Sequence, residues 1–153
     1  MRPRDLLHAC AELLREVLTF TQPADSAVSA YFRTHRSLGV RERHTLAETV
    51  YNVLRRRLLY QHLAQSGSGS IERRMAALGW AGDTDYLKAA LDEGEWLWLT
   101  KARAVDVKTL APKLRHNMPD WLSQPLQEQL GEENFRALAT SLNVAAPLDL
   151  RVN

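Results

Sequence analysis

The sequence predicts an all-α fold of about seven helices. Apolar residues recur at spacings of three and four along most of the chain, which is the period of an amphipathic helix. Proline, glycine and capping residues separate these stretches, and apolar and polar residues alternate strictly only near the end, within residues 145–153. A chain of 153 residues suits one domain, or two small subdomains sharing a core, and can fold without disulfides.

Three helices are expected in the first part of the chain. The first covers residues 5–20, and its inward face carries Leu6, Leu7, Cys10, Leu13, Leu14, Val17 and Leu18. The second follows Pro23, with Asp25 or Ser26 as its cap, and buries Ala27, Val28, Tyr31 and Phe32. The third is a long helix over residues 41–65, and its expected inward stripe is Ala47, Val50, Tyr51, Leu54 and Leu58.

Residues 66–70, with the sequence Ser-Gly-Ser-Gly-Ser, predict a flexible linker. The linker divides an N-terminal subdomain, residues 1–65, from a C-terminal subdomain, residues 71–144. A short helix over residues 71–78 and a longer one over residues 86–100 are expected to follow it.

Several residues define the helices of the C-terminal subdomain. Asp83 or Asp85 can cap the helix over residues 86–100, and Gly94 weakens it. Trp96 and Trp98 cannot share one helix face, so at least one of them is expected to be partly exposed or packed on another segment.

The end of the chain carries two more helix signals. Pro119 and Asp120 predict a helix start, and Ser123 predicts the cap of a second helix that ends at Gly131. The last helix covers residues 132–143, with Phe135, Leu138, Ala139 and Leu142 inward. The alternation in residues 145–153 predicts a strand that opens a next, absent module, which suggests a chain cut from a longer protein.

The charge is distributed unevenly along the chain. Between residues 33 and 62 lie seven arginines and only two glutamates, whereas residues 83–95 carry five acids and one lysine. Such a basic segment favours a polyanionic partner, although a solvated helix face is the alternative interpretation. The candidate residues for binding a nucleic acid are Arg33, Arg36, Arg41, Arg43, Arg55, Arg56 and Arg57. In a continuous third helix, Arg43 and Arg57 would lie along one edge.

No credible active site can be assembled from these residues. The single cysteine, Cys10, excludes an internal disulfide and a cysteine-built zinc site, and its place on an apolar stripe predicts a buried thiol. His44 and Glu48 lack further ligands for a metal, and the acids of residues 92–95 are expected to face solvent. There is no glycine-rich phosphate loop. Without a secretory signal or a long apolar run, the chain is expected to be cytoplasmic and not bound to a membrane.

Three stretches resemble the N-terminal region of the Sun/Fmu-type (NOP2/Sun family) ribosomal RNA cytosine-5 methyltransferases. The first runs from Ala-Asp-Ser-Ala-Val to Leu-Gly-Val-Arg-Glu-Arg in residues 24–43, and the second is Glu-Thr-Val-Tyr-Asn-Val-Leu-Arg-Arg-Arg in residues 48–57. The third joins Asn-Met-Pro-Asp-Trp-Leu, residues 117–122, through Leu-Gly at 130–131 and Ser-Leu-Asn at 141–143, to Ala-Pro-Leu-Asp-Leu-Arg-Val-Asn, residues 146–153. The likeness covers nearly the whole chain but is thin from about residue 66 to residue 114.

The resemblance implies a NusB-like helical bundle that binds or orients structured RNA. In that family the S-adenosylmethionine-binding catalytic domain and its two cysteines follow the Arg-Val-Asn segment, and Cys10 matches neither cysteine motif. No cofactor is therefore expected in this chain, although S-adenosylmethionine is expected for a full-length parent. The implied function is an RNA-binding accessory domain that is not catalytic alone, with ribosomal RNA and its own catalytic domain as partners.

Two alternatives remain open at this stage. The tryptophan-rich second half could make the chain a protein-interaction module that docks on the catalytic domain or on a ribosomal protein. The chain could also be a free-standing NusB-like antitermination factor.

Overall fold

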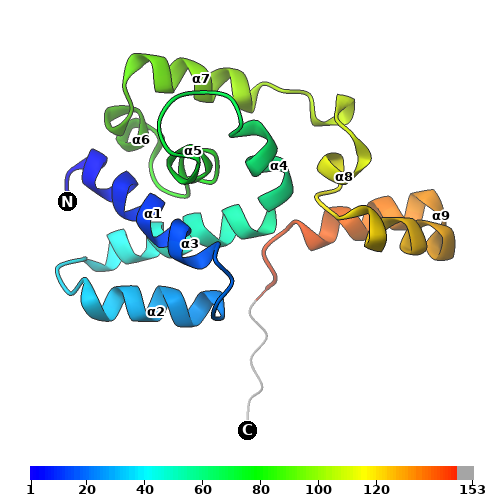
Figure 1. Ribbon diagram of the computed structural model, residues 1–153, viewed down its shortest axis with the longest axis horizontal. Coiled ribbons are helices and arrows are strands. Elements are labelled where there is room, and N and C mark those ends of the chain that lie inside the picture. The colour runs from blue at the N-terminus through cyan, green and yellow to red at the C-terminus, as the bar shows by residue number, and fades with distance from the viewer. Residues whose placement is uncertain (148–153) are drawn as a thin grey trace, which may run out of the picture. The chain divides into compact units, whose positions relative to one another are not determined.

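The computed structural model describes residues 1–147, and all regular structure in that part of the chain is helical (Figure 1). This confirms the all-α class, with nine α-helices in the described residues instead of about seven. The α-helices are α1 (Pro3–Val17), α2 (Ala24–Thr34), α3 (Val40–Arg55), α4 (Arg57–Leu63), α5 (Ile71–Leu78), α6 (Thr84–Ala90), α7 (Glu93–Arg103), α8 (Pro112–Arg115) and α9 (Asp120–Leu142), with a 3₁₀ turn η1 at Val107–Thr109. The expected C-terminal strand lies largely outside the described residues.

The chain forms two compact units, Met1–Asp106 and one that begins at Val107. The expected boundary at residues 66–70 differs from this division, because α5, which follows that segment, packs directly on α1 and α3. Residues 66–70 therefore connect two helices of the same unit.

Helix α1 is the centre of the first unit and contacts α2, α3, α5 and α6. Its inward side chains are almost completely removed from solvent, as the periodicity of the sequence predicts. Burying an aliphatic side chain of this size stabilises a fold by about 1.5–3 kcal/mol, so this helix contributes a large share of the apolar burial. The buried residues of α1 are Leu6, Leu7, Ala9, Cys10, Ala11, Leu13, Leu14 and Val17.

The predicted long third helix is broken at Arg56 into α3 and α4. The backbone of Arg56 leaves the helical region, with φ −122° and ψ 30°. In an unbroken helix, Arg57 would follow Val53 on the buried face, four residues later. The break instead brings Leu59 inward, with 7% of its surface exposed, so no arginine has to be buried in its place.

The inward face of α3 also differs from the expected stripe. Leu46, Thr49, Val50 and Val53 are buried, whereas Tyr51 and Leu54 are only half-buried. Thr49 is a polar residue on this face that is completely buried, and its hydroxyl oxygen accepts a hydrogen bond from the Ala81 amide at 3.1 Å, which satisfies the buried hydroxyl. Leu54 therefore lies at the edge of the core and not in its middle.

Residues 66–70 form a loop that is bound to the first unit. Arg74 donates hydrogen bonds to the carbonyl oxygens of Ala64 at 2.8 Å and Gly69 at 2.6 Å, and the Trp98 indole N–H donates to the Ser66 hydroxyl at 3.1 Å. Gly67 has φ +100°, and a Cβ there would lie 2.9 Å from the Arg74 side chain. The predicted role as an inter-subdomain linker is thus replaced by a role as a fixed turn between α4 and α5.

The predicted helix over residues 86–100 is divided into α6 and α7. Asp83 caps α6 as predicted, by accepting a hydrogen bond from the Tyr86 amide at 2.9 Å. The chain then breaks at Leu91, and Asp92 and Glu95 form a reciprocal capping box at the start of α7, with N···O distances of 2.7 and 3.0 Å. Trp96 and Trp98 are both half-buried against the core.

The second unit has a small core of its own, formed by Met118, Phe135 and Ala139. Helix α9 begins at Asp120, as predicted, but continues through Ser123 and Pro125 without a new cap. Gly131, at φ 76° and ψ 163°, then bends the helix, which confirms the predicted break. Phe135 and Ala139 point inward as expected, whereas Leu142 is 58% exposed.

Candidate nucleic-acid interface

The structure divides the seven candidate arginines between the two ends of α3. Arg33, Arg36, Arg41 and Arg43, here called the α2–α3 cluster, lie where α2 leads into α3. Arg55, Arg56 and Arg57, here called the α3–α4 cluster, lie at the break between α3 and α4. Arg41 and Arg55 are about 21 Å apart along the axis of α3, so the two clusters are separate features.

Within the α2–α3 cluster, Arg43 is engaged in the fold. Its Nε donates a hydrogen bond to the Leu38 carbonyl oxygen at 3.0 Å, and its guanidinium carbon lies 5.7 Å from the centre of the Phe32 ring. Arg33, Arg36 and Arg41 are exposed, and Arg36 Nε donates only a long hydrogen bond of 3.4 Å to the Arg33 carbonyl oxygen. Three of these four side chains are therefore open to a partner.

The α3–α4 cluster presents three guanidinium groups from consecutive residues at a helix break. Arg56 is exposed at the break itself. Arg55 Nη1 donates to Asn52 Oδ1 at 2.9 Å, and Asn52 Nδ2 donates to the Gly79 carbonyl oxygen at 3.2 Å. This chain of two hydrogen bonds ties the orientation of Arg55 to the packing of α5 against α3.

Arg57 faces an aromatic side chain that the sequence alone did not single out. Its guanidinium carbon lies 5.2 Å from the centre of the Phe20 ring, within the range of a cation–π contact. The expected common edge of Arg43 and Arg57 does not exist, because α3 ends at Arg55 and Arg57 belongs to α4. The sequence feature that could have singled out Phe20 is its position as an aromatic residue among polar neighbours just after an amphipathic helix.

The acidic segment of residues 83–95 is explained in part by helix capping. Asp83 and Asp92 cap α6 and α7, and Glu95 also binds Arg73 at 2.6 Å between carboxylate and guanidinium. The hydrogen bond from Arg73 holds the pKa of Glu95 below its ordinary value. Asp92 and Glu93 are exposed as expected, whereas Glu95 is half-buried.

The one cysteine of the chain, Cys10, is buried in the core of the first unit. Burial raises the pKa of the Cys10 thiol to about 12, so it is a poor nucleophile at neutral pH. No group of three or more potential metal ligands occurs in residues 1–147. No helix in this part of the chain has the length and apolar character needed to cross a membrane.

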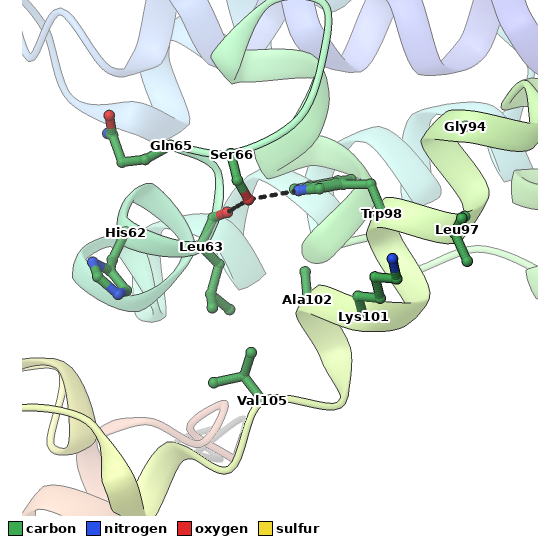
Figure 2. A pocket seen from close by; sticks show the side chains of 10 residues that line it. All are labelled: His62, Leu63, Gln65, Ser66, Gly94, Leu97, Trp98, Lys101, Ala102 and Val105. Atoms are coloured by element: carbon green, nitrogen blue, oxygen red, sulfur yellow. Dashed lines mark hydrogen bonds between the residues drawn. The ribbon is translucent and has the colours of Figure 1, made fainter.

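An apolar groove of about 670 Å³ lies between α4 and α7 of the first unit (Figure 2). Leu63 of α4 and Trp98 of α7 line it, and Lys101 and Val105 continue the wall on one side. Leu97, in the same wall, is 54% exposed. Apolar side chains supply most of the lining surface, and His62, Gln65, Ser66 and Lys101 also border the groove. Such a lining suits an apolar side chain better than a polar small molecule.

Comparisons of the chain with protein-family models, curated proteins and solved structures find no match.

Proposed function

We propose that this chain is an RNA-binding accessory domain of an S-adenosylmethionine-dependent ribosomal RNA cytosine-5 methyltransferase, without catalytic activity of its own. The observation that carries the proposal is the α3–α4 cluster, three consecutive arginines at a helix break, of which Arg57 lies over an exposed aromatic ring. Arginines bind phosphates as charged hydrogen-bond donors, and aromatic rings stack on bases. The resemblance in residues 24–57 and 117–153 gives the proposal its enzyme class and its NusB-like fold.

The residues present do not fit the methyl-transfer chemistry itself. Cys10, the single cysteine, is buried and its thiol has a raised pKa of about 12. The contribution assigned to this chain is therefore to bind RNA and to orient a target cytosine for the catalytic domain of a larger protein.

The salt dependence of RNA binding tests this proposal. We expect a fluorescein-labelled RNA hairpin to bind the chain with an affinity that falls steeply between about 50 and 200 mM salt. The triple variant Arg55→Gln, Arg56→Gln and Arg57→Gln removes three charges while nearly preserving helix propensity. Each phosphate that the variant no longer neutralises should flatten the slope of log K against log salt by roughly 0.7–0.9.

The α2–α3 cluster offers a charge-matched comparison. The triple variant Arg33→Gln, Arg36→Gln and Arg41→Gln removes the same charge from exposed positions, so a purely non-local effect of net charge would be equal in both variants. We expect the α3–α4 variant to weaken binding more. Unchanged affinity and slope in the α3–α4 variant would mean that this cluster is a solvated face.

Exposed apolar side chains favour a second candidate, a protein-interaction module. Trp121, in the Pro-Asp-Trp-Leu motif of α9, is 75% exposed, and Leu97 lies open at the groove between α4 and α7. Large exposed aromatic residues are enriched at protein interfaces. If the Arg55–Arg57 variant binds RNA normally, this candidate becomes the favoured one.

A further inference from the structure

Phe20 occupies an unusual place for a large apolar side chain. It lies in the turn after α1, 58% exposed, with a φ of 54° that non-glycine residues rarely adopt. The turn holds it there through hydrogen bonds from the Phe20 amide to the Val17 carbonyl at 3.1 Å and from the Thr19 hydroxyl to the Glu16 carbonyl at 2.7 Å. The Gln22 side chain also donates to the Glu16 carboxylate at 3.1 Å. The turn therefore holds the ring at the surface just beyond the end of α1.

The second observation is the position of Arg57 over the Phe20 ring. The two residues come from different elements, the α1–α2 turn and the start of α4. Arg57 is half-buried, and its guanidinium covers part of one ring face at 5.2 Å from the ring centre. A ring that remains 58% exposed beside this contact keeps an accessible surface for a further flat group.

We propose that Phe20 and Arg57 form a stacking platform for an unpaired RNA base, an inference that rests on the RNA-binding function proposed above. A base offers a flat π surface to the ring, and a phosphate beside that base would meet the guanidinium group of Arg57. Bases inside a duplex are already stacked on each other, so the platform selects unpaired bases in a loop, a bulge or a single-stranded overhang. Because every base has a π face, the platform has little preference for sequence.

The variant Phe20→Gly is designed to remove the stacking platform and to leave the fold intact. Glycine adopts positive φ without strain, so the denaturant concentration at the unfolding midpoint of this variant should be at least as high as that of the wild type. Phe20→Trp keeps a stacking surface and serves as the conservative variant. All three arginines of the α3–α4 cluster stay in place, so electrostatic binding is retained.

The probes are a blunt RNA duplex and the same duplex with a three-nucleotide adenine bulge, both labelled with fluorescein. We expect Phe20→Gly to weaken binding of the bulged RNA by about 5- to 150-fold, the equivalent of stacking one base on an aromatic ring. Its binding of the blunt duplex and its salt slope should stay unchanged, and Phe20→Trp should bind the bulged RNA like the wild type. A 2-aminopurine base placed in the bulge should lose fluorescence on binding to the wild type but not to Phe20→Gly.

The outcomes separate this inference from the proposed function. If Phe20→Gly binds the bulged RNA as tightly as the wild type with the same salt slope, RNA binding stands and the platform is refuted. If the wild type binds neither RNA at about 50 mM salt, the proposed function fails and the platform fails with it. An equal decrease in affinity for both RNAs in Phe20→Gly would also overturn the platform, because stacking of an unpaired base cannot affect a blunt duplex.

Discussion

Replacing Gly79 with alanine should destabilise the first unit, because the added methyl group has no space against α3. An ideal Cβ at Gly79 would lie 2.6 Å from Cγ2 of Val53, and 3.3 Å from both the Val53 amide nitrogen and the Thr49 carbonyl oxygen. Overpacking of this kind costs about 1–3 kcal/mol. The reduced entropy of the unfolded chain without this glycine offsets about 0.4–1 kcal/mol. We therefore expect a net decrease of about 1.3 kcal/mol in the free energy of unfolding, within a range of about 0–2.6 kcal/mol.

Urea unfolding followed by tryptophan fluorescence measures this decrease, and Gly94→Ala is the matched control. A Cβ at Gly94, inside α7, would meet nothing closer than an Asp92 carboxylate oxygen at 3.4 Å. That variant should be as stable as the wild type or up to about 1 kcal/mol more stable, because alanine favours the helix. Equal stabilities for Gly79→Ala and Gly94→Ala would refute the close packing of α5 on α3. The hydrogen bonds from Arg55 to Asn52 and from Asn52 to the Gly79 carbonyl depend on this packing, so Arg55 would then no longer be expected to keep its orientation.

Three further predictions concern stability and pH. Leu46→Ala should lower the free energy of unfolding in urea by about 2–5 kcal/mol, because Leu46 is fully buried. Leu54→Ala should lower it clearly less, because Leu54 is half-buried, and the reverse order would contradict the observed inward face of α3. The pKa of Glu95 is lowered in the folded state by its hydrogen bond from Arg73, so this pair stabilises the fold above the unfolded pKa of about 4.5. That contribution is lost as the pH falls through the folded pKa, and Glu95→Gln should flatten the acid limb of the stability curve. Burial lowers the pKa of His116, so the second unit should lose stability as the pH falls below about 6.5. We expect this loss to appear as exchange broadening of the NMR signals of that unit, and pH-independent signals would contradict it.

Local signals in the sequence were sufficient for several elements. The spacing of Leu6, Cys10, Leu13 and Val17 predicts α1 and its buried face because a single helix stripe decides both. Capping by Asp83 is a contact between residues three apart, so it too can be inferred from the sequence. The all-helical class follows from many such local features taken together.

Contacts between distant residues account for the features that could not be predicted from the sequence. Thr49 is polar in sequence, yet it is completely buried on the inward face of α3, where its hydroxyl accepts a hydrogen bond from the distant Ala81 amide. Residues 66–70 have the composition of a flexible linker, but Arg74 and Trp98 bind them to the first unit. The break between α6 and α7 is an exception, because it is marked by a local signal, the capping box of Asp92 and Glu95.

The candidate site was only partly predictable for the same reason. The basic run at residues 55–57 is visible in the sequence, but its division from the α2–α3 cluster depends on where the helices begin and end. The pairing of Arg57 with Phe20 joins residues far apart in the chain, so no spacing rule could have shown it.

An NMR titration of the ¹⁵N-labelled chain with an RNA hairpin is the sharpest test of the proposed RNA site, since it reports residue by residue where RNA binds. We expect the amides of residues 19–22 and 55–58 to shift together at low RNA concentration and to return towards their free positions as salt is raised. Shifts confined to α9 around Trp121, or to the groove between α4 and α7, would contradict an RNA site at the α3–α4 cluster. The absence of any shift at low salt would contradict RNA binding itself.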